Sequence, residues 1–372
     1  MSLSLSLSLS LNSQAQERLE FWFESQNYLS RQVARSDTSL SERQAENFYE
    51  DRVYQLHGEL VKPLTSDAAN TPAPAIVFLV GSGPNSSHQS LYADFVRENL
   101  EALFLNHGIA LLYFDKRGVG LSEGRWHRTD LFERADDARS AVRALRQHPG
   151  IDGNRIGVVG HSQGGTVAQL LGAMYGDSLA FIASLAAPTY DTERRLTHEY
   201  YSRFLCEGDP EAEAMDRAQK KAISDLNWVN AFPLTKAWRH LSELSDFDPA
   251  PYLAQLSLPA YFAFPEEDYF VSADWAIEAL RLARPSSTSP DFAEHLTVQS
   301  FPGLDHDFRP TDNLCTGSGV EISFEKEVEQ KDDEQKEVAK SKYTEEYIPL
   351  PDFSENFQQA FQAWVLAVFG LN

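Results

Sequence analysis

The stretch from Arg155 to Gly172 constrains the fold of this chain more than any other. Ile156–Val159 is a short apolar run rich in β-branched residues, which is typical of a buried strand, and Thr166–Met174 has the apolar character of a buried helix. Between them stands Gly160-His-Ser-Gln-Gly164, so a Gly-x-Ser-x-Gly pattern joins the strand to the helix. A serine on so tight a turn has a strained backbone, and the flanking glycines are needed because strand and helix nearly touch. The stretch therefore predicts a nucleophile turn that exposes Ser162 above a sheet.

Strand-like and helix-like segments alternate around this turn. The predicted strands, besides the one before Ser162, are 75–80, 109–114, 181–185, 260–264 and 296–301. The predicted helices are 91–106, 131–147, 166–174, 275–282 and 353–369. Such alternation indicates a mostly parallel central sheet with helices on both faces, which is the α/β class.

Four parts are expected along the chain. Residues 1–50 form an N-terminal tail and helical segment, in which 14–49 is predicted to be helical, and 51–187 form the first part of the α/β core. Residues 53–61 alternate as a strand does and are placed at the edge of the sheet. Residues 188–256 are predicted to form a helical cap, and 257–372 the second part of the core with a charged insertion at 311–342.

The predicted cap is charged, helical and rich in bulky aromatic side chains, and it is inserted between two strands of the sheet. Because ligands bind outside the carboxyl ends of the strands in α/β folds, we interpret it as a lid over the site. An ordinary helical subdomain without substrate contact is the alternative.

Composition narrows the partners. The net charge is −23 without a basic cluster in the sequence, which argues against a nucleic-acid partner. The sequence contains no run of eighteen apolar residues, so we predict no membrane-spanning segment. The Ser-Leu repeat of residues 1–11 lacks the positive start and continuous apolar core of an export signal, so a cytoplasmic location is expected, with periplasmic export as the alternative. Cys206 and Cys315 show neither metal spacing nor a disulfide framework and are interpreted as incidental. The oligomeric state is left open.

Three chemically complementary residues follow successive predicted strands, in the order Ser162, Asp268, His306. Serine is a poor nucleophile until a neighbouring imidazole takes its proton, and a carboxylate orients that imidazole and stabilises its charged form. The order Ser…Asp…His is that of α/β hydrolases. Carboxylates that compete with Asp268 for the acid role are Glu266, Glu267, Asp305 and Asp307.

Several other histidines compete with His306 for the role of the base. His161 adjoins the serine but points apart from it on the turn, so it is interpreted as a packing residue. His88 follows a glycine-rich turn and is a candidate for substrate contact. Three further histidines lie in or beside regular elements, and we predict no function for them: His57, His148 and His295.

The turn Gly81-Ser-Gly-Pro84 follows a predicted central strand and can present backbone N–H groups to a ligand. Pro84 has no N–H, so Ser82 and Gly83 are the available donors. A simple turn is the alternative. The glycines and charges of 115–124 are interpreted as shaping a loop.

These motifs, together with Tyr113-Phe-Asp-Lys-Arg-Gly-Val-Gly-Leu-Ser-Glu-Gly124, resemble bacterial α/β-hydrolase serine esterases of the dienelactone-hydrolase-like and acyl-CoA-thioesterase-like carboxylesterase group. The resemblance spans residues 54–308 and the final helix. It implies Ser162 as nucleophile, His306 as base and Asp268 as acid. It also implies that the N–H groups of Gly83 and Gln163 form the oxyanion hole, and that Asp115 and Arg117 belong to a structural loop.

The sequence thus predicts a hydrolase, free of cofactor and metal, that cleaves small to medium acyl esters through an acyl-enzyme. Peptidase, thioesterase and acyltransferase activities use the same residues and stay open. A non-catalytic binding protein of the same fold is the alternative from another class.

Overall fold

The computed structural model describes residues 16–27, 52–63, 71–87, 92–283, 295–317 and 352–371. Within these ranges, eight strands form one sheet in the order β1-β2-β4-β3-β5-β6-β7-β8. The strands are β1 (Gln16–Gln26), β2 (Val53–Pro63), β3 (Ala73–Leu79), β4 (Ala110–Phe114), β5 (Ile151–His161), β6 (Phe181–Leu185), β7 (Ala260–Pro265) and β8 (Leu296–Phe301). Strands β4 to β8 and β3 run parallel, whereas β1 and β2 pair antiparallel at one edge.

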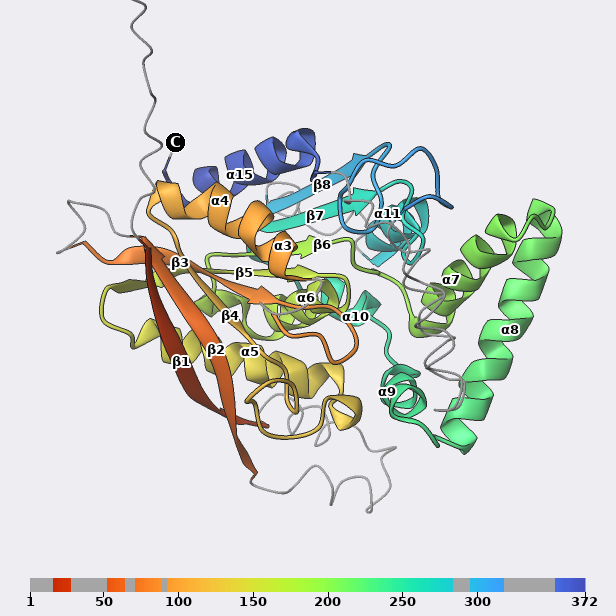
Figure 1. Cartoon of the computed structure of the whole chain (residues 1–372), viewed down its shortest axis with the longest axis horizontal. Coiled ribbons are helices and arrows are strands. Elements are labelled where there is room, and N and C mark those ends of the chain that lie inside the picture. Colours follow the sequence, from red (N-terminus) through yellow and green to blue (C-terminus); the bar gives the residue numbers. More distant parts are fainter. Residues whose placement is uncertain are drawn as a thin grey trace, which may run out of the picture.

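Helices cover both faces of this sheet (Figure 1). On one face pack α5 (Leu131–Arg146), α6 (Gln163–Tyr175) and α11 (Ala273–Ala283), whose apolar side chains join the larger core cluster. On the other face pack α15 (Glu355–Phe369) and the broken helix composed of α3 (Tyr92–Val96), η1 (Arg97–Glu101), α4 (Ala102–Phe104) and η2 (Leu105–His107). Short helical turns are η3 (Trp126–Arg128) and η4 (Gly176–Ser178). The α/β class expected from the alternation of segments is confirmed.

The prediction of a helix over 14–49 is wrong where the structure describes it, because residues 16–26 form the edge strand β1. Phe21, Phe23 and Ser25 are buried while Trp22 between them is half exposed, so the apolar period is two and not 3.6. Strand β2 is consequently the second strand, and not the edge strand that was expected. Residues 1–15 and 28–51, which include the Ser-Leu repeat, lie outside the described residues.

The end of β1 is fastened to the core by buried polar contacts. Arg117 donates to Asp137 Oδ1 at 2.7 Å, to Glu133 Oε1 at 2.9 Å and to Asn27 Oδ1 at 2.7 Å. Ser25 donates to the same Asp137 oxygen. The buried Arg117 guanidinium is thus bonded both to α5 and to Asn27, the residue that follows β1. These bonds explain why the edge strand packs at this place.

Four helices separate β6 from β7. They are α7 (Thr192–Cys206), α8 (Glu211–Ala231), α9 (Lys236–Leu244) and α10 (Ala250–Leu253). Figure 1 shows α7 and α8 side by side at one end of the molecule, away from the sheet, with α9 near the lower end of α8. Small apolar clusters of their own, built around Leu196, Phe204 and Ala218, hold α7 against α8. We call residues 192–253 the helical insertion.

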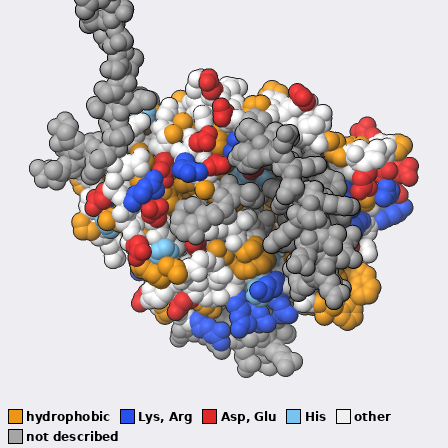
Figure 2. Space-filling model, in the orientation of Figure 1, with side chains coloured by type: hydrophobic (Ala, Val, Ile, Leu, Met, Phe, Trp, Pro, Cys, Tyr) orange, Lys and Arg blue, Asp and Glu red, His pale blue; other side chains and the backbone are white. Residues whose placement is uncertain are grey.

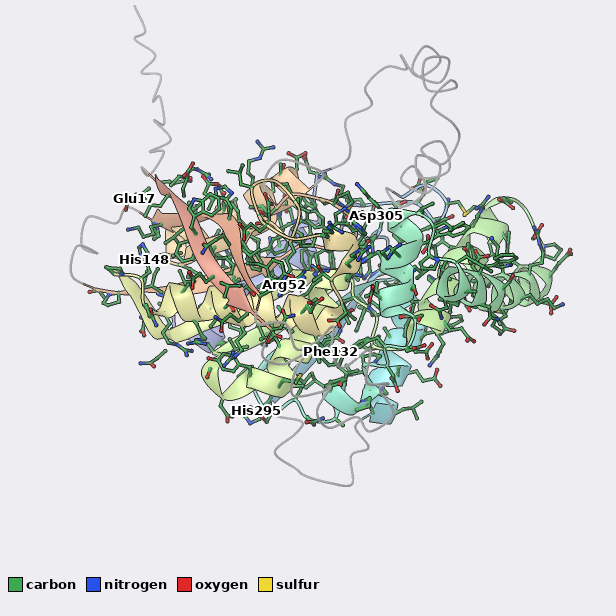
Figure 3. The ribbon with its side chains drawn as sticks, turned by 90° about the horizontal axis from the view of Figure 1, so that it is seen from below. Glu17, Arg52, Phe132, His148, His295 and Asp305 are labelled. Atoms are coloured by element: carbon green, nitrogen blue, oxygen red, sulfur yellow. A yellow bond between two sulfur atoms is a disulfide. The ribbon has the colours of Figure 1, made fainter. Side chains whose placement is uncertain are left out.

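Cys206 and Cys315 form a disulfide, so the interpretation of both as incidental is wrong (Figure 3). Their Cα atoms lie 5.4 Å apart across 109 residues of sequence. Spacing in the sequence does not reveal such a pair, because the cysteines meet only when the insertion folds onto the core. The bond joins the end of α7 to the segment that follows β8. Of the predicted charged insertion at 311–342, only 311–317 lie within the described residues.

No helix among the residues that the structure describes is long and apolar enough to cross a bilayer.

Candidate active site

Ser162 occupies a strained turn between β5 and α6. Its backbone has φ 54° and ψ −128°, in a region that L-residues other than glycine rarely adopt. A Cβ on Gly160 would lie 2.1 Å from the Gly164 carbonyl oxygen, and one on Gly164 would lie 2.0 Å from the Leu79 carbonyl oxygen. Only glycine fits either place. The turn therefore has the geometry of a nucleophile elbow.

Asp268 and His306 meet after β7 and β8. The Asp268 Oδ2 atom lies 2.7 Å from His306 Nδ1. The other oxygen, Oδ1, accepts hydrogen bonds from the N–H groups of Phe270 at 2.8 Å and Val271 at 3.0 Å. The carboxylate is almost fully buried, and both of its oxygens are satisfied. Such a carboxylate holds the imidazole in one orientation, with Nε2 directed away from Asp268.

Two of the competing carboxylates, Glu267 and Asp305, accept hydrogen bonds from backbone N–H groups. Glu267 Oε2 accepts from the Gly303 N–H at 3.0 Å, and Asp305 Oδ1 accepts from the N–H groups of Asp307 and Arg309, each at 3.0 Å. Glu266 is exposed. These residues shape the loops around the histidine, while Asp268 contacts its ring.

Burial alone would lower the pKa of His306. The charge of Asp268 and the hydrogen bond with it, with smaller contributions from Asp307 and Asp305, raise that pKa above its usual value. The imidazole is consequently a stronger base than a free histidine.

A relay of hydrogen bonds through His161 joins the nucleophile turn to the His306 loop. The Gly81 N–H donates to Tyr92 Oη at 2.9 Å, and Tyr92 Oη lies 3.1 Å from His161 Nδ1. His161 Nε2 lies 2.9 Å from the His306 carbonyl oxygen. Since a carbonyl only accepts, Nε2 carries the proton and Nδ1 accepts from the tyrosine. Burial first, and then His306, lower the pKa of His161 to about 4, which keeps the ring neutral.

His161 therefore does more than pack. Because His161 directly precedes Ser162, its hydrogen bond holds the His306 backbone next to the nucleophile turn. The centroids of the His161 and His306 rings lie 4.9 Å apart. The sequence signal was its place next to the serine, but nothing local identified its partners. Within the described residues the Ser162 hydroxyl makes no hydrogen bond, so its proton path to His306 belongs to the proposal below.

The turn Gly81-Pro84 lies directly against Ser162. A Cβ on Gly81 would be 3.1 Å from Ser162 Cβ. Lys116 donates to the carbonyl oxygens of both Gly81, at 2.7 Å, and Gly83. Within the part of the chain that the structure describes, the N–H groups of Gly83 and Gln163 have no acceptor. That these two N–H groups form the oxyanion hole stays a prediction from the resemblance.

Two buried cations hold this turn, and sequence reasoning missed both. Lys116 comes from the loop after β4, and burial, followed by Arg134, lowers its pKa well below the usual range. Arg134 Nη2 donates to the Val80 carbonyl oxygen at 2.6 Å, and Nη1 donates to the Gln163 side-chain oxygen. The loop 115–124 is structural, as expected, but what it structures is the turn beside Ser162. A lysine directly after a buried central strand was the available signal.

The helical insertion touches the loops that carry each predicted catalytic residue. His198 of α7 lies with Nε2 3.0 Å from the Asp268 carbonyl oxygen. His240 of α9 lies with Nε2 3.2 Å from Gln163 Nε2, and Cys206 is bonded to Cys315 after the His306 loop. The insertion therefore rests on the rim around Ser162.

The other histidines lie elsewhere or outside the described residues. His57 packs on Trp22 at a centroid distance of 4.7 Å, and His148 packs on Phe21 at 6.1 Å. In Figure 3, His148 and His295 are far from Asp305, the residue before His306. His88 lies outside the residues that the structure describes.

Comparison with known proteins finds similarity to hydrolases. The family described as serine aminopeptidase, S33, matches residues 73–227. The esterase EstD of Thermotoga maritima is 22% identical over 244 residues, which cover 65% of this chain and 58% of the esterase. The chain thus spans less than two thirds of that relative's length.

Solved structures of similar proteins include the Pyrococcus furiosus esterase Pf2001, with a TM-score of 0.47 at 16% identity over 81% of this chain and 88% of that one. The 2,6-dihydroxy-pseudo-oxynicotine hydrolase gives a TM-score of 0.44 at 19% identity over 68% of this chain and 59% of that one.

The family match, the strand order and the strained serine between β5 and α6 agree with one another. The chain has an α/β-hydrolase fold, and residues 73–227 match the family described as serine aminopeptidase, S33.

Proposed function

We propose that the protein is a serine esterase that cleaves carboxylic esters of small to medium acyl groups through an acyl-enzyme. Two observations support the proposal: the strained backbone of Ser162 on the turn between β5 and α6, and the distance of 2.7 Å between His306 Nδ1 and Asp268 Oδ2. Similarity to the esterase EstD supports the same reaction type.

In the proposed mechanism the Ser162 Oγ forms a bond with the ester carbonyl carbon as its proton passes to His306 Nε2. Asp268 stabilises the imidazolium that results. The negative charge on the former carbonyl oxygen is accepted by the N–H groups of Gly83 and Gln163, at the positive N-terminus of α6. Each such donor typically contributes about 3 kcal/mol of transition-state stabilisation.

The tetrahedral intermediate collapses when His306 returns the proton to the alcohol oxygen, which leaves as the free alcohol. Water then loses a proton to the same imidazole and attacks the acyl carbon. Collapse of the second intermediate returns the proton to Ser162 Oγ and releases the carboxylic acid, so the enzyme ends unchanged.

An aminopeptidase is the second candidate, because the family match is described by that activity. Such an enzyme must bind the ammonium group of a peptide N-terminus. Arg134 and Lys116, the basic side chains that hold the turn beside Ser162, offer such a group no counter-charge. We therefore rank ester cleavage first.

The experiment compares wild type, Ser162→Ala and the control Ser242→Ala, whose hydroxyl contacts Asn230 on the exposed side of the insertion. Substrates are p-nitrophenyl esters of increasing acyl length, aminoacyl p-nitroanilides and acyl thioesters. Wild type and Ser242→Ala should turn over the esters and react with a fluorophosphonate probe, and Ser162→Ala should do neither. Near-native ester turnover by Ser162→Ala would refute the proposal, as would preferred cleavage of the anilides.

A further inference from the structure

Four cations gather where the helical insertion meets the core. Arg125 precedes η3 and Arg128 is its last residue, and Lys236 and Arg239 belong to α9, which packs against η3. We call these four residues the basic rim. Figure 2 shows Lys and Arg side chains grouped around a histidine in the region where Figure 1 places α9. The grouping stands out because the chain as a whole carries a net charge of −23.

The basic rim carries excess positive charge. Among the described residues, none of its four cations forms an ion pair with a carboxylate, whereas cations elsewhere on the insertion do, such as Lys220 with Asp216 at 2.6 Å. The Arg239 guanidinium donates to the Pro233 carbonyl oxygen at 3.2 Å. The neighbouring acid is Glu243, whose pKa is raised by burial and by Glu133 although Arg239 and Arg128 lower it.

The four cations of the basic rim all affect the pKa of His127. Burial lowers its pKa first, followed by Lys236, Arg128, Arg239 and Arg125, all of which act in the same direction. No acidic residue is among the main influences on this ring. The four cations of the basic rim therefore act in the same direction on one ring, in a chain whose net charge is −23.

Packed rings connect the rim to the nucleophile turn. The Trp126 ring lies 5.6 Å from His127 and 5.3 Å from His240, centroid to centroid. His240 Nε2 accepts a hydrogen bond from Gln163 Nε2 at 3.2 Å, and Gln163 follows Ser162. A side-chain amide nitrogen only donates, so the proton of His240 resides on Nδ1.

That Nδ1 atom is buried and has no partner among the described residues. Burial first, and then Arg134 and other cations, lower the pKa of His240 to about 3, so the ring stays neutral. A buried N–H without an acceptor is costly, and it points to a ligand that supplies one. An acceptor that carries negative charge suits the surrounding cations best.

We propose that the basic rim, with His240 between it and Ser162, binds an anionic group of the substrate, so that the preferred esters carry a carboxylate or a similar anion. This inference rests on the proposed esterase function. Arginine matches carboxylate geometry through paired N–H groups, and a local positive patch on an acidic protein concentrates anions where the reaction takes place.

The test uses two matched pairs of esters. Anionic 4-acetoxybenzoate is compared with neutral methyl 4-acetoxybenzoate, and anionic monophenyl adipate with neutral phenyl hexanoate, so that the charge sits once on the alcohol side and once on the acyl side. The measured quantity is the ratio of kcat/KM for the anionic ester to that for its neutral partner. The variants are Lys236→Gln/Arg239→Gln and Arg125→Gln/Arg128→Gln. The matched control is Lys220→Gln/Lys221→Gln, which removes two cations from α8, where each is paired with an aspartate.

Wild type should favour the anionic member of at least one pair by about tenfold or more at low ionic strength. This preference should shrink as salt rises, because exposed charges are screened over about 10 Å at 0.1 M. Each rim variant should lower the ratio by about tenfold, and the control should keep it.

Equal turnover of both members of each pair, or a ratio that the rim variants and the control change alike, would overturn the inference while Ser162-dependent ester hydrolysis still stood. Failure of every ester, charged or neutral, together with absence of fluorophosphonate labelling, would overturn the esterase function and the inference with it.

Discussion

Lys116 Nζ donates a hydrogen bond to the carbonyl oxygen of Gly81 at 2.7 Å, and the same ammonium reaches the carbonyl oxygen of Gly83. One buried amino group thus donates to two carbonyl groups of the same tight turn. The peptide between Gly81 and Ser82 is trans, so the Gly81 carbonyl and the Ser82 N–H point in opposite directions, and the Ser82 N–H points away from Lys116. The orientation of the turn beside Ser162 therefore depends on a side chain from a neighbouring strand end.

Replacing Lys116 by methionine should lower kcat by about tenfold to a hundredfold while KM changes little. The reason is that the turn would no longer present its N–H groups to the charge that develops in the transition state. Two carbonyl groups would also lose their donor, so the free energy of unfolding should fall by about 1–3 kcal/mol. Kinetics corrected by active-site titration with a fluorophosphonate separate the two effects. Lys62→Met, on β2, is the control, and an unchanged titrated kcat in Lys116→Met would contradict the positioning role.

The raised pKa of His306 sets the acidic limb of the pH profile. Since the base must be neutral, kcat/KM should rise with pH through a midpoint above the usual histidine value of about 6.5. Asp268→Asn should lower kcat by about 10⁴-fold and shift this midpoint to lower pH, because the carboxylate charge is lost. Glu266→Gln is the control and should leave the midpoint in place. A midpoint that moved in Glu266→Gln and stayed in Asp268→Asn would exchange the two acids.

The interaction between Asp268 and His306 should also make the stability of the folded protein depend on pH. A pKa raised by folding means that the protonated ring is stabilised, and this contribution is present in full below the unfolded value and lost as pH rises through the folded one. The melting temperature of Asp268→Asn should therefore fall further below wild type at pH 5 than at pH 9. Equal differences at both values of pH would show that the pair contributes nothing through its charge.

The disulfide between Cys206 and Cys315 closes a loop of 109 residues. A cross-link of that span restricts the unfolded chain by about 4–5 kcal/mol in the chain-entropy account. We expect Cys206→Ser/Cys315→Ser, or reduction of wild type, to lower the melting temperature, and reduction of the variant to add nothing further. Two alkylatable thiols in the purified native protein would disprove the pairing.

Disulfides persist in oxidising compartments. The cytoplasmic location predicted from the sequence stays a prediction, and on the basis of the disulfide we propose export as the alternative to be tested. Fractionation of the producing cells, followed by detection of the protein in each fraction, distinguishes the two.

Gly164→Ala should prevent formation of the turn at Ser162. Its new Cβ would lie 2.0 Å from the Leu79 carbonyl oxygen, which is backbone and cannot move without displacing β3. We expect little folded protein, or folded protein without fluorophosphonate labelling. Gly176→Ala is the control, since its Cβ would meet only the Leu258 side chain, at 3.3 Å, without a positive φ. Native yield and labelling in Gly164→Ala would contradict the steric account.

Much of the site followed from local sequence. The glycines around Ser162 are required by contacts within a single turn, so residues close in sequence carry the information. The order of Ser162, Asp268 and His306 followed from strand ends that face the same edge of a parallel sheet. The structure brings Asp268 and His306 into contact, while the transfer of a proton from Ser162 remains part of the proposal.

Tertiary contacts decided the rest. Residues 16–26 became a strand because β2 offered an unpaired edge and Arg117 a buried anchor, neither of which is a property of the segment itself. The choice of Asp268 over Glu266 and Glu267 depended on a loop that turns one carboxylate inward. The disulfide, the Lys116 contacts and the basic rim each join residues that are distant in sequence. Local steric constraints on the backbone can be read one turn at a time. Long-range pairings depend on which surfaces meet after the sheet has formed, and so only the folded chain reveals them.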